Sequence, residues 1–168
     1  MTIGGGEKPT PPDPLVRAAA AQYDAARQLL AAGGGPGSGV LFPLLNASIV
    51  AVELYLKSLA ASQVNKVWSF VPVFWTVHAK PEKRGHGLIA LLEAIPNGIR
   101  ITLEQEFERG SHSGGPLHAV LENYEGLFEI SRYPYEVESN VQKYPVAPLM
   151  RLVDFLRDFV ASRAPSGS

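Results

Sequence analysis

The chain contains no cysteine among its 168 residues. It can therefore form no disulfide, no thiolate metal site and no cysteine nucleophile. Its charges nearly cancel, with 15 basic against 16 acidic residues, so the composition does not favour a long nucleic-acid backbone as a stable partner. The lack of cysteine also fits a cytoplasmic protein, which is the localisation we expect.

Several motifs of enzymes and metalloproteins are missing as well. The glycine-rich run at 33–37 lacks the Gly-Lys-Ser/Thr ending of a phosphate-binding loop. There is no Gly-x-Ser-x-Gly segment for a hydrolase nucleophile and no His-Glu-x-x-His segment for zinc. His78, His112 and His118 have no helical metal spacing, and Asp and Glu do not cluster with them. We therefore expect no metal and no cofactor.

Hydrophobic residues make up 46% of the chain, which is enough for a globular core. Residues 1–12 are rich in glycine and proline without an apolar run, which predicts a disordered arm and not a signal peptide. Residues 165–168 should form a short disordered tail. The apolar stretch from Val40 to Ala61 is long enough to suggest a membrane span, but Glu53 and Lys57 fall inside it. It therefore predicts a buried core helix and no membrane partner.

Helical periodicity dominates residues 13–164 and predicts one all-α domain, an up-and-down bundle of five or six helices. The first helix should begin at Asp13, a good N-cap, with Pro14 in its first turn. Its predicted buried stripe is Val16, Ala19, Tyr23, Ala26 and Leu30. The expected helices cover about 13–32, 43–62, 87–94, 99–109, 116–131 and 148–163.

One extended, aromatic-rich excursion interrupts the helices at about 64–77. It is rich in β-branched and aromatic residues, with Pro72 near its middle, which predicts an extended segment or a short hairpin. Both tryptophans of the chain, Trp68 and Trp75, lie in it. Such aromatic residues favour packing on a bundle edge or a protein partner, and stacking on single-stranded RNA is the alternative.

Three polar residues share one face of the otherwise apolar core helix. Asn46, Glu53 and Lys57 follow one another at spacings of seven and four. Ionisable residues in a buried helix are unfavourable unless they are paired or face a cleft. This stripe is therefore either an internal ion pair or the wall of a site, where Lys57 would bind an anion and Glu53 would act as a base or orient the ligand.

A second set of candidate residues follows the fifth expected helix. Arg132, Tyr133 and Tyr135 could bind a phosphate and stack on a base, or they could pair with a carboxylate and pack on the bundle. His86 lies beside two basic residues at the start of a short helix. It is either a capping residue or a general acid–base group that folding brings near Arg132.

Short segments that occur in a particular order carry a family resemblance. They are Tyr23 and Ala26, then Val52–Lys57, then Gly85–Leu88 followed by Leu91 and Leu92, and last Arg132–Glu136. Their order resembles the HEPN superfamily, the nucleotide-binding helical domains of higher eukaryotes and prokaryotes. The resemblance covers about 13–163 and implies a helical bundle, a homodimer and a role in prokaryotic toxin–antitoxin or defence systems, with RNA or a nucleotide as ligand.

The chain departs from this family at its ribonuclease motif. HEPN nucleases carry an arginine separated by four to six residues from a histidine, whereas the positions after Arg132 hold Val137, Glu138 and Ser139. The resemblance therefore supports the fold more than the nuclease activity. The sequence predicts a homodimeric binding or regulatory protein that lacks the standard motif. We expect its shared cleft to be lined by Asn46, Glu53, Lys57 and Arg132.

Two alternatives stay open. The chain could be a divergent, metal-independent endoribonuclease in which Arg132 stabilises the scissile phosphate and His86 acts as acid and base. It could also be an interaction domain with a protein partner, in which the polar stripe is only an internal ion pair.

Overall fold

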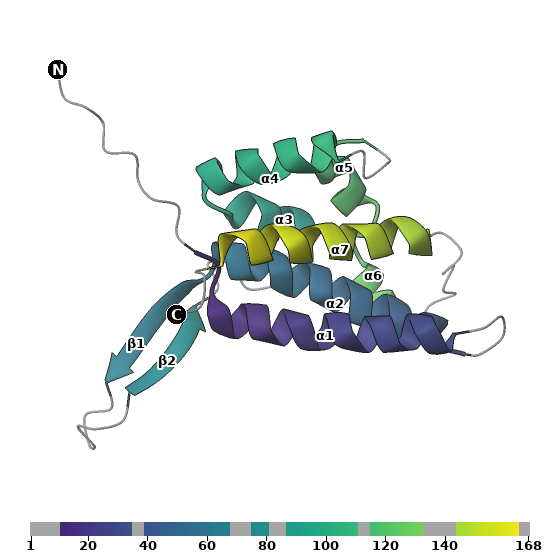
Figure 1. Ribbon diagram of the computed structural model, residues 1–168, viewed down its shortest axis with the longest axis horizontal. Coiled ribbons are helices and arrows are strands. Elements are labelled where there is room, and N and C mark those ends of the chain that lie inside the picture. Colours follow the sequence, from purple (N-terminus) through teal and green to yellow (C-terminus); the bar gives the residue numbers. More distant parts are fainter. Residues whose placement is uncertain are drawn as a thin grey trace.

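The computed structural model describes residues 11–34, 39–67, 75–80, 87–110, 115–132 and 144–164. These residues form seven helices and two strands (Figure 1). The elements are α1 (Pro14–Gly33), α2 (Leu41–Ala60), β1 (Ser62–Val67), β2 (Trp75–Lys80), α3 (Leu88–Ala94), α4 (Asn97–Arg109), α5 (Leu117–Glu122), α6 (Leu127–Arg132) and α7 (Val146–Arg163). The predicted helical bundle is confirmed.

Helix α2 is the centre of the bundle. It is buried along most of its length and packs against α1, α3, α6 and α7. Its side chains Leu45, Val52 and Leu56 are completely inaccessible to solvent. Because so many elements pack on this one helix, its apolar faces form most of the core, as its sequence predicts.

Length and composition alone would also allow α2 to cross a membrane. Among the described helices it is the one that passes this test, and 56% of its most apolar window is buried inside the bundle. A core helix passes the same test, so the finding is weak evidence for a membrane.

The other helices form layers around α2. Figure 1 shows α1, α2 and α7 lying side by side with similar axes, with α3, α4 and α5 stacked on one side of them. The predicted stripes of α4 and α7 are buried. They consist of Ile99, Leu103 and Phe107 in α4 and of Leu149, Leu152, Val153, Leu156, Phe159 and Val160 in α7. Regular apolar spacing therefore predicted these two helices well.

The extended excursion contains a β-hairpin. Strands β1 and β2 pair antiparallel, from Ser62 opposite Lys80 to Val67 opposite Trp75. The hairpin interpretation of this segment is thus confirmed for the paired strands, while Trp68 and Pro72 lie outside the described residues.

The expected helix at 116–131 is interrupted. The chain forms α5, a turn at 123–126 and then α6, and Gly126 in the turn has a left-handed φ of 78°. Tyr124 in this turn is buried, and its hydroxyl donates a hydrogen bond of 2.8 Å to the carbonyl of Pro145 before α7. The periodicity continued across the break because the turn keeps Tyr124 and Leu127 on the core side.

The predicted stripe of α1 is wrong in phase. Tyr23 is 42% exposed, and the residues that α1 buries are Ala20, Asp24 and Arg27. An alanine-rich helix offers little difference in apolar area between its faces, so contacts of its polar residues can decide its rotation. The N-cap prediction is confirmed, since the Asp13 carboxylate accepts from the backbone N–H groups of Leu15 and Val16 at 2.9 and 3.0 Å.

The short helix α3 takes its cap from a distant residue. Gly87 at the N-cap position has no side chain to accept a hydrogen bond, and Glu125 accepts one from the Ile89 N–H at 2.8 Å. A carboxylate at this end of a helix satisfies an unpaired donor and also opposes the positive end of the helix dipole. The turn between α5 and α6 therefore holds α3 in place.

We expect Glu125→Ala to lower the free energy of unfolding by about 0.5–2 kcal/mol, the usual contribution of a cap. Urea unfolding monitored by circular dichroism measures this change. Glu122→Ala is the matched control, because Glu122 is exposed at the end of α5. Equal effects of the two substitutions would contradict a capping role for Glu125.

Candidate functional site

The polar stripe of α2 contains an ion pair. The Lys57 ammonium donates to the Glu53 carboxylate at 2.5 Å, and their side chains are only 17% and 6% exposed. A glutamate four residues before a lysine is the favourable order for such a pair on a helix. The geometry favours the interpretation in which these two residues stabilise α2 internally.

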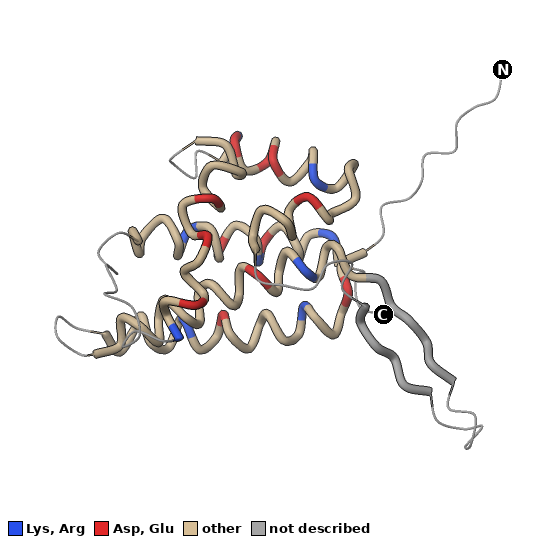
Figure 2. Tube along the Cα trace, turned by 180° about the vertical axis from the view of Figure 1, so that it is seen from behind, with Lys and Arg blue, Asp and Glu red and all other residues tan. Residues whose placement is uncertain are grey.

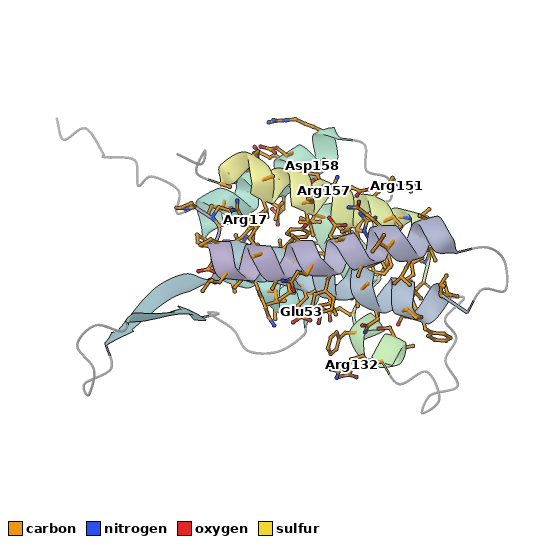
Figure 3. All side chains as sticks on the ribbon, turned by 60° about the horizontal axis from the view of Figure 1, so that its bottom comes forward. Arg17, Glu53, Arg132, Arg151, Arg157 and Asp158 are labelled. Carbon is orange, nitrogen blue, oxygen red and sulfur yellow. The ribbon has the colours of Figure 1, made fainter. Side chains whose placement is uncertain are left out.

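Asn46 connects the stripe to α6. Its amide donates to the Ser131 hydroxyl at 3.1 Å, and Ser131 donates in turn to the carbonyl of Phe128 at 3.1 Å. The next residue, Arg132, is exposed, and its guanidinium carbon lies 5.1 Å from the centre of the Phe128 ring. Figure 3 shows Arg132 at the outer side of its helix. Asn46 therefore lies close to the segment that carries Arg132.

Other predicted site residues fall outside the described part of the chain. They are His86, Tyr133 and Tyr135. The proposed approach of His86 to Arg132 therefore stays a prediction.

A cluster that the sequence did not single out lies where α1, α2 and α7 meet. Asp24 and Arg27 are buried on α1, and the Arg27 guanidinium donates to Asp24 Oδ1 at 2.6 and 2.9 Å. The same guanidinium donates to Asp154 on α7 at 2.7 Å. From α2, the Tyr55 hydroxyl donates to Asp24 Oδ2 at 3.2 Å. We call Asp24, Arg27, Tyr55, Asp154 and Arg157 the charged cluster.

Arg157 completes the charged cluster from α7. It donates to Asp154 at 2.9 Å and lies 3.6 Å from Asp24 Oδ2. It also donates to Asp158 at 2.9 Å, and this hydrogen bond, together with the nearby carboxylates, raises the pKa of Arg157. The carboxylates thus hold the guanidinium in one orientation at the edge of α7.

The tyrosine of the charged cluster is kept neutral by its surroundings. Burial raises the pKa of Tyr55 well above its usual range, and the negative charge of Asp24 and the hydrogen bond to it raise it further. A tyrosinate there would be poorly solvated and would lie against a carboxylate. Tyr55 therefore acts as a hydrogen-bond donor to Asp24 and not as a base.

The local signal for this cluster is present in the sequence but weak. Asp24 and Arg27 are three residues apart, which places them on one side of a helix. Such pairs are usually solvent-exposed, and only the contacts with Tyr55 and Asp154 from other helices identify this one as buried. Tertiary contacts of this kind cannot be read from helical spacing.

The described residues form a hollow on each of two sides of α7. One, of about 330 Å³, lies between α1 and α7, which both rest on α2. We call it the α1–α7 pocket, and it is lined by Pro14, Arg17, Ala18, Ala21, Tyr55, Arg157, Val160 and Ala161. The other is a wider groove of about 620 Å³ between α4 and α7, whose lining has mixed charge, including Glu106, Arg109, Arg151, Asp154 and Asp158.

Within the described residues, no group of three or more His, Cys, Asp or Glu side chains could hold a metal ion. His118 lies there on the exposed side of α5. Comparison with known proteins adds no identification: no family model, no curated protein and no solved structure matches this chain.

We expect Arg27→Met to lower the free energy of unfolding by about 3–5 kcal/mol, because it removes the closest charged partner of the buried Asp24 carboxylate and leaves only Arg157, at 3.6 Å. Urea unfolding at neutral pH measures the loss. Asp158→Asn is the matched control, since it removes an exposed ion pair that should contribute about 0–1 kcal/mol. If Arg27→Met lowers the free energy of unfolding by less than Asp158→Asn does, the charged cluster does not stabilise the bundle.

The Tyr55 pKa generates a prediction for alkaline pH. Because the folded state raises this pKa, the folded state holds the proton more tightly than the unfolded chain. The resulting stabilisation is complete below the unfolded pKa of about 10 and is lost as pH rises towards the folded value. Tyr55→Phe should therefore be less stable than the unmodified protein at neutral pH. Above a pH of about 10, its free energy of unfolding should fall less steeply with pH than that of the unmodified protein.

Free energies of unfolding measured from a pH of about 8 to a pH of about 11 test this expectation. This pH range includes the values at which an ordinary tyrosine ionises. Tyr23→Phe, on the exposed side of α1, is the matched control. If the free energy of unfolding has the same slope against pH in Tyr55→Phe and in the unmodified protein, ionisation of Tyr55 is not linked to folding.

Proposed function

We propose that this chain is a HEPN-like binding or regulatory module that acts as a homodimer and associates through the outer side of α1. The observation that carries the proposal is the inverted character of that helix. Its buried side holds Asp24 and Arg27, whereas its leucines at positions 15 and 29 are 50% and 76% exposed. Exposed apolar surface of this kind is typical of an interaction site.

The outer side of α1 carries no charge. The charged residues of the helix are Arg17, Asp24 and Arg27, and Figure 2 shows the rest of its tube without charged positions. Five exposed residues recur at spacings of three and four along this side, which is the pattern of a helix-pairing surface. We call them the α1 seam: Leu15, Ala18, Gln22, Ala25 and Leu29.

The residues of this side are nearly symmetric about Gln22. Leu15 and Leu29 lie seven positions on either side of it, and alanines occupy the positions three and four away in both directions. In an antiparallel pair of identical helices related by a two-fold axis at Gln22, each leucine would meet the other leucine of the partner copy. The alanines between them would let the two helices approach closely.

This arrangement agrees with the homodimer that the HEPN resemblance implies. In the proposal, the dimer presents a binding surface to RNA, a nucleotide or a protein partner in a prokaryotic stress or defence setting. Arg132 and the segment after it, with Tyr133 and Tyr135, are its candidate contacts. Glu53 and Lys57 then serve as an internal ion pair behind that surface.

We expect Leu29→Glu to convert the dimer to a monomer, because each of the two symmetric contacts would then bury one carboxylate against a leucine of the partner copy. Light scattering coupled to size-exclusion chromatography measures the mass. Ile101→Glu is the matched control, since Ile101 is another exposed large apolar residue and lies on α4. Association through the α1 seam is excluded if both variants keep the mass of the unmodified protein.

The proposed two-fold axis has a sharper test, because the chain has no cysteine of its own. Gln22→Cys places one thiol beside the axis, where it should form a disulfide with its symmetry mate under mild oxidation. Arg109→Cys, exposed at the end of α4, is the control that should stay uncrosslinked at equal concentration. Equal crosslinking of the two variants would argue against antiparallel pairing at Gln22.

The ribonuclease alternative is tested on the same preparations with a mixed, labelled RNA pool. Cleavage that Arg132→Ala abolishes in a folded protein would replace the binding proposal with the enzyme proposal. RNA that stays intact while it is retained by the dimer would support binding without catalysis.

A further inference from the structure

The α1–α7 pocket has the features of a site for a small ligand. Its volume of about 330 Å³ lies at the lower end of the range for ligand pockets, about 300–1,000 Å³. Three of the residues that line it are small, Ala18 and Ala21 on α1 and Ala161 on α7, and Tyr55 of α2 lines it with them. Larger side chains at these positions would fill the space, so the alanines leave it open.

Both charged residues that line the pocket are arginines. The carboxylates that hold Arg157 orient it at the rim. Within the described residues, no ion pair or side-chain hydrogen bond engages the guanidinium of Arg17. Figure 3 shows Arg17 and Arg157 on the side where α1 and α7 run next to each other. The pocket therefore offers one preoriented guanidinium and one whose donors are not engaged by the side chains of the described residues.

The remaining walls are apolar. Pro14, Val160 and the three alanines contribute them, and the Tyr55 hydroxyl is already used in its hydrogen bond to Asp24. A guanidinium binds carboxylate and phosphate groups through paired N–H donors. Apolar walls of this size favour a short hydrocarbon or ring next to that anionic group.

We propose that the α1–α7 pocket binds a small amphipathic anion, with its carboxylate or phosphate on Arg17 at the rim and its apolar part between α1 and α7. All lining residues belong to one chain. The site therefore does not depend on the dimer proposed above, although Ala18 belongs to both the pocket and the α1 seam.

Calorimetric titration with octanoate and with octyl phosphate tests the site, with octanol and inorganic phosphate as the neutral and the purely ionic probes. We expect one octanoate or octyl phosphate per chain, and no measurable heat with octanol. Preference between the two anions identifies the headgroup. Binding of inorganic phosphate as tight as that of octyl phosphate would overturn the amphipathic ligand, and no binding of any anion would overturn the site.

Arg17→Leu should weaken binding by about tenfold or more, the loss expected for a charge-assisted hydrogen bond. Ala21→Phe should block the pocket, and because Ala21 is exposed on α1 this variant should keep the melting temperature of the unmodified protein. Arg109→Leu, which lines the groove between α4 and α7, is the matched control and should bind normally. Binding that Arg17→Leu and Ala21→Phe leave unchanged would place the ligand elsewhere and refute the proposal.

The variant Leu29→Glu separates this inference from the dimer. It should bind the anion as the unmodified protein does, whatever its oligomeric state, because Leu29 does not line the pocket. Loss of binding in this variant would contradict a pocket formed by a single chain.

Discussion

The buried pair of Asp24 and Arg27 determines how α1 lies on α2 and α7. Its hydrogen bonds reach Tyr55 on α2 and Asp154 on α7, so one pair of side chains connects three helices. Burying charge is unfavourable unless these partners are all present, which restricts α1 to a single rotation about its axis. An apolar stripe of alanines could not have imposed that restriction alone.

The rotation of α1 about its axis has two structural consequences. With Asp24 and Arg27 turned inward, the helix presents leucine and alanine to solvent, which gives the α1 seam. With Ala18 and Ala21 beside α7, the contact between these two helices stays incomplete and the α1–α7 pocket remains open. Both candidate interaction surfaces therefore depend on the charged cluster, which itself has no exposed reactive group on Asp24 or Tyr55.

The sequence predicted most of the fold because several helices have regular apolar faces. In α4 and α7 the large side chains recur at helical spacing, and burial of those faces gives far more free energy than any alternative rotation. The same reasoning failed for α1, where Tyr23 is exposed and Asp24 is buried. It also missed the turn between α5 and α6, because Tyr124 and Leu127 face the core on both sides of Gly126.

The candidate site was less predictable than the fold. The pairing of Glu53 with Lys57 followed from their spacing on one helix, whereas the contacts of Tyr55 and Asp154 with α1 join residues far apart in sequence. Long-range polar contacts depend on the final packing of helices, and no local pattern encodes them. The position of His86 relative to Arg132 lies outside the described residues.

The alanines of the α1 seam also limit how strongly two copies could hold each other. An alanine side chain buries little apolar area, so the two leucines at the ends would supply most of the favourable free energy. An interface of this kind forms and separates readily, and the fraction of paired chains then follows the protein concentration. The oligomeric state of such a chain would depend on its abundance in the cell, because accumulation alone would convert single bundles into pairs.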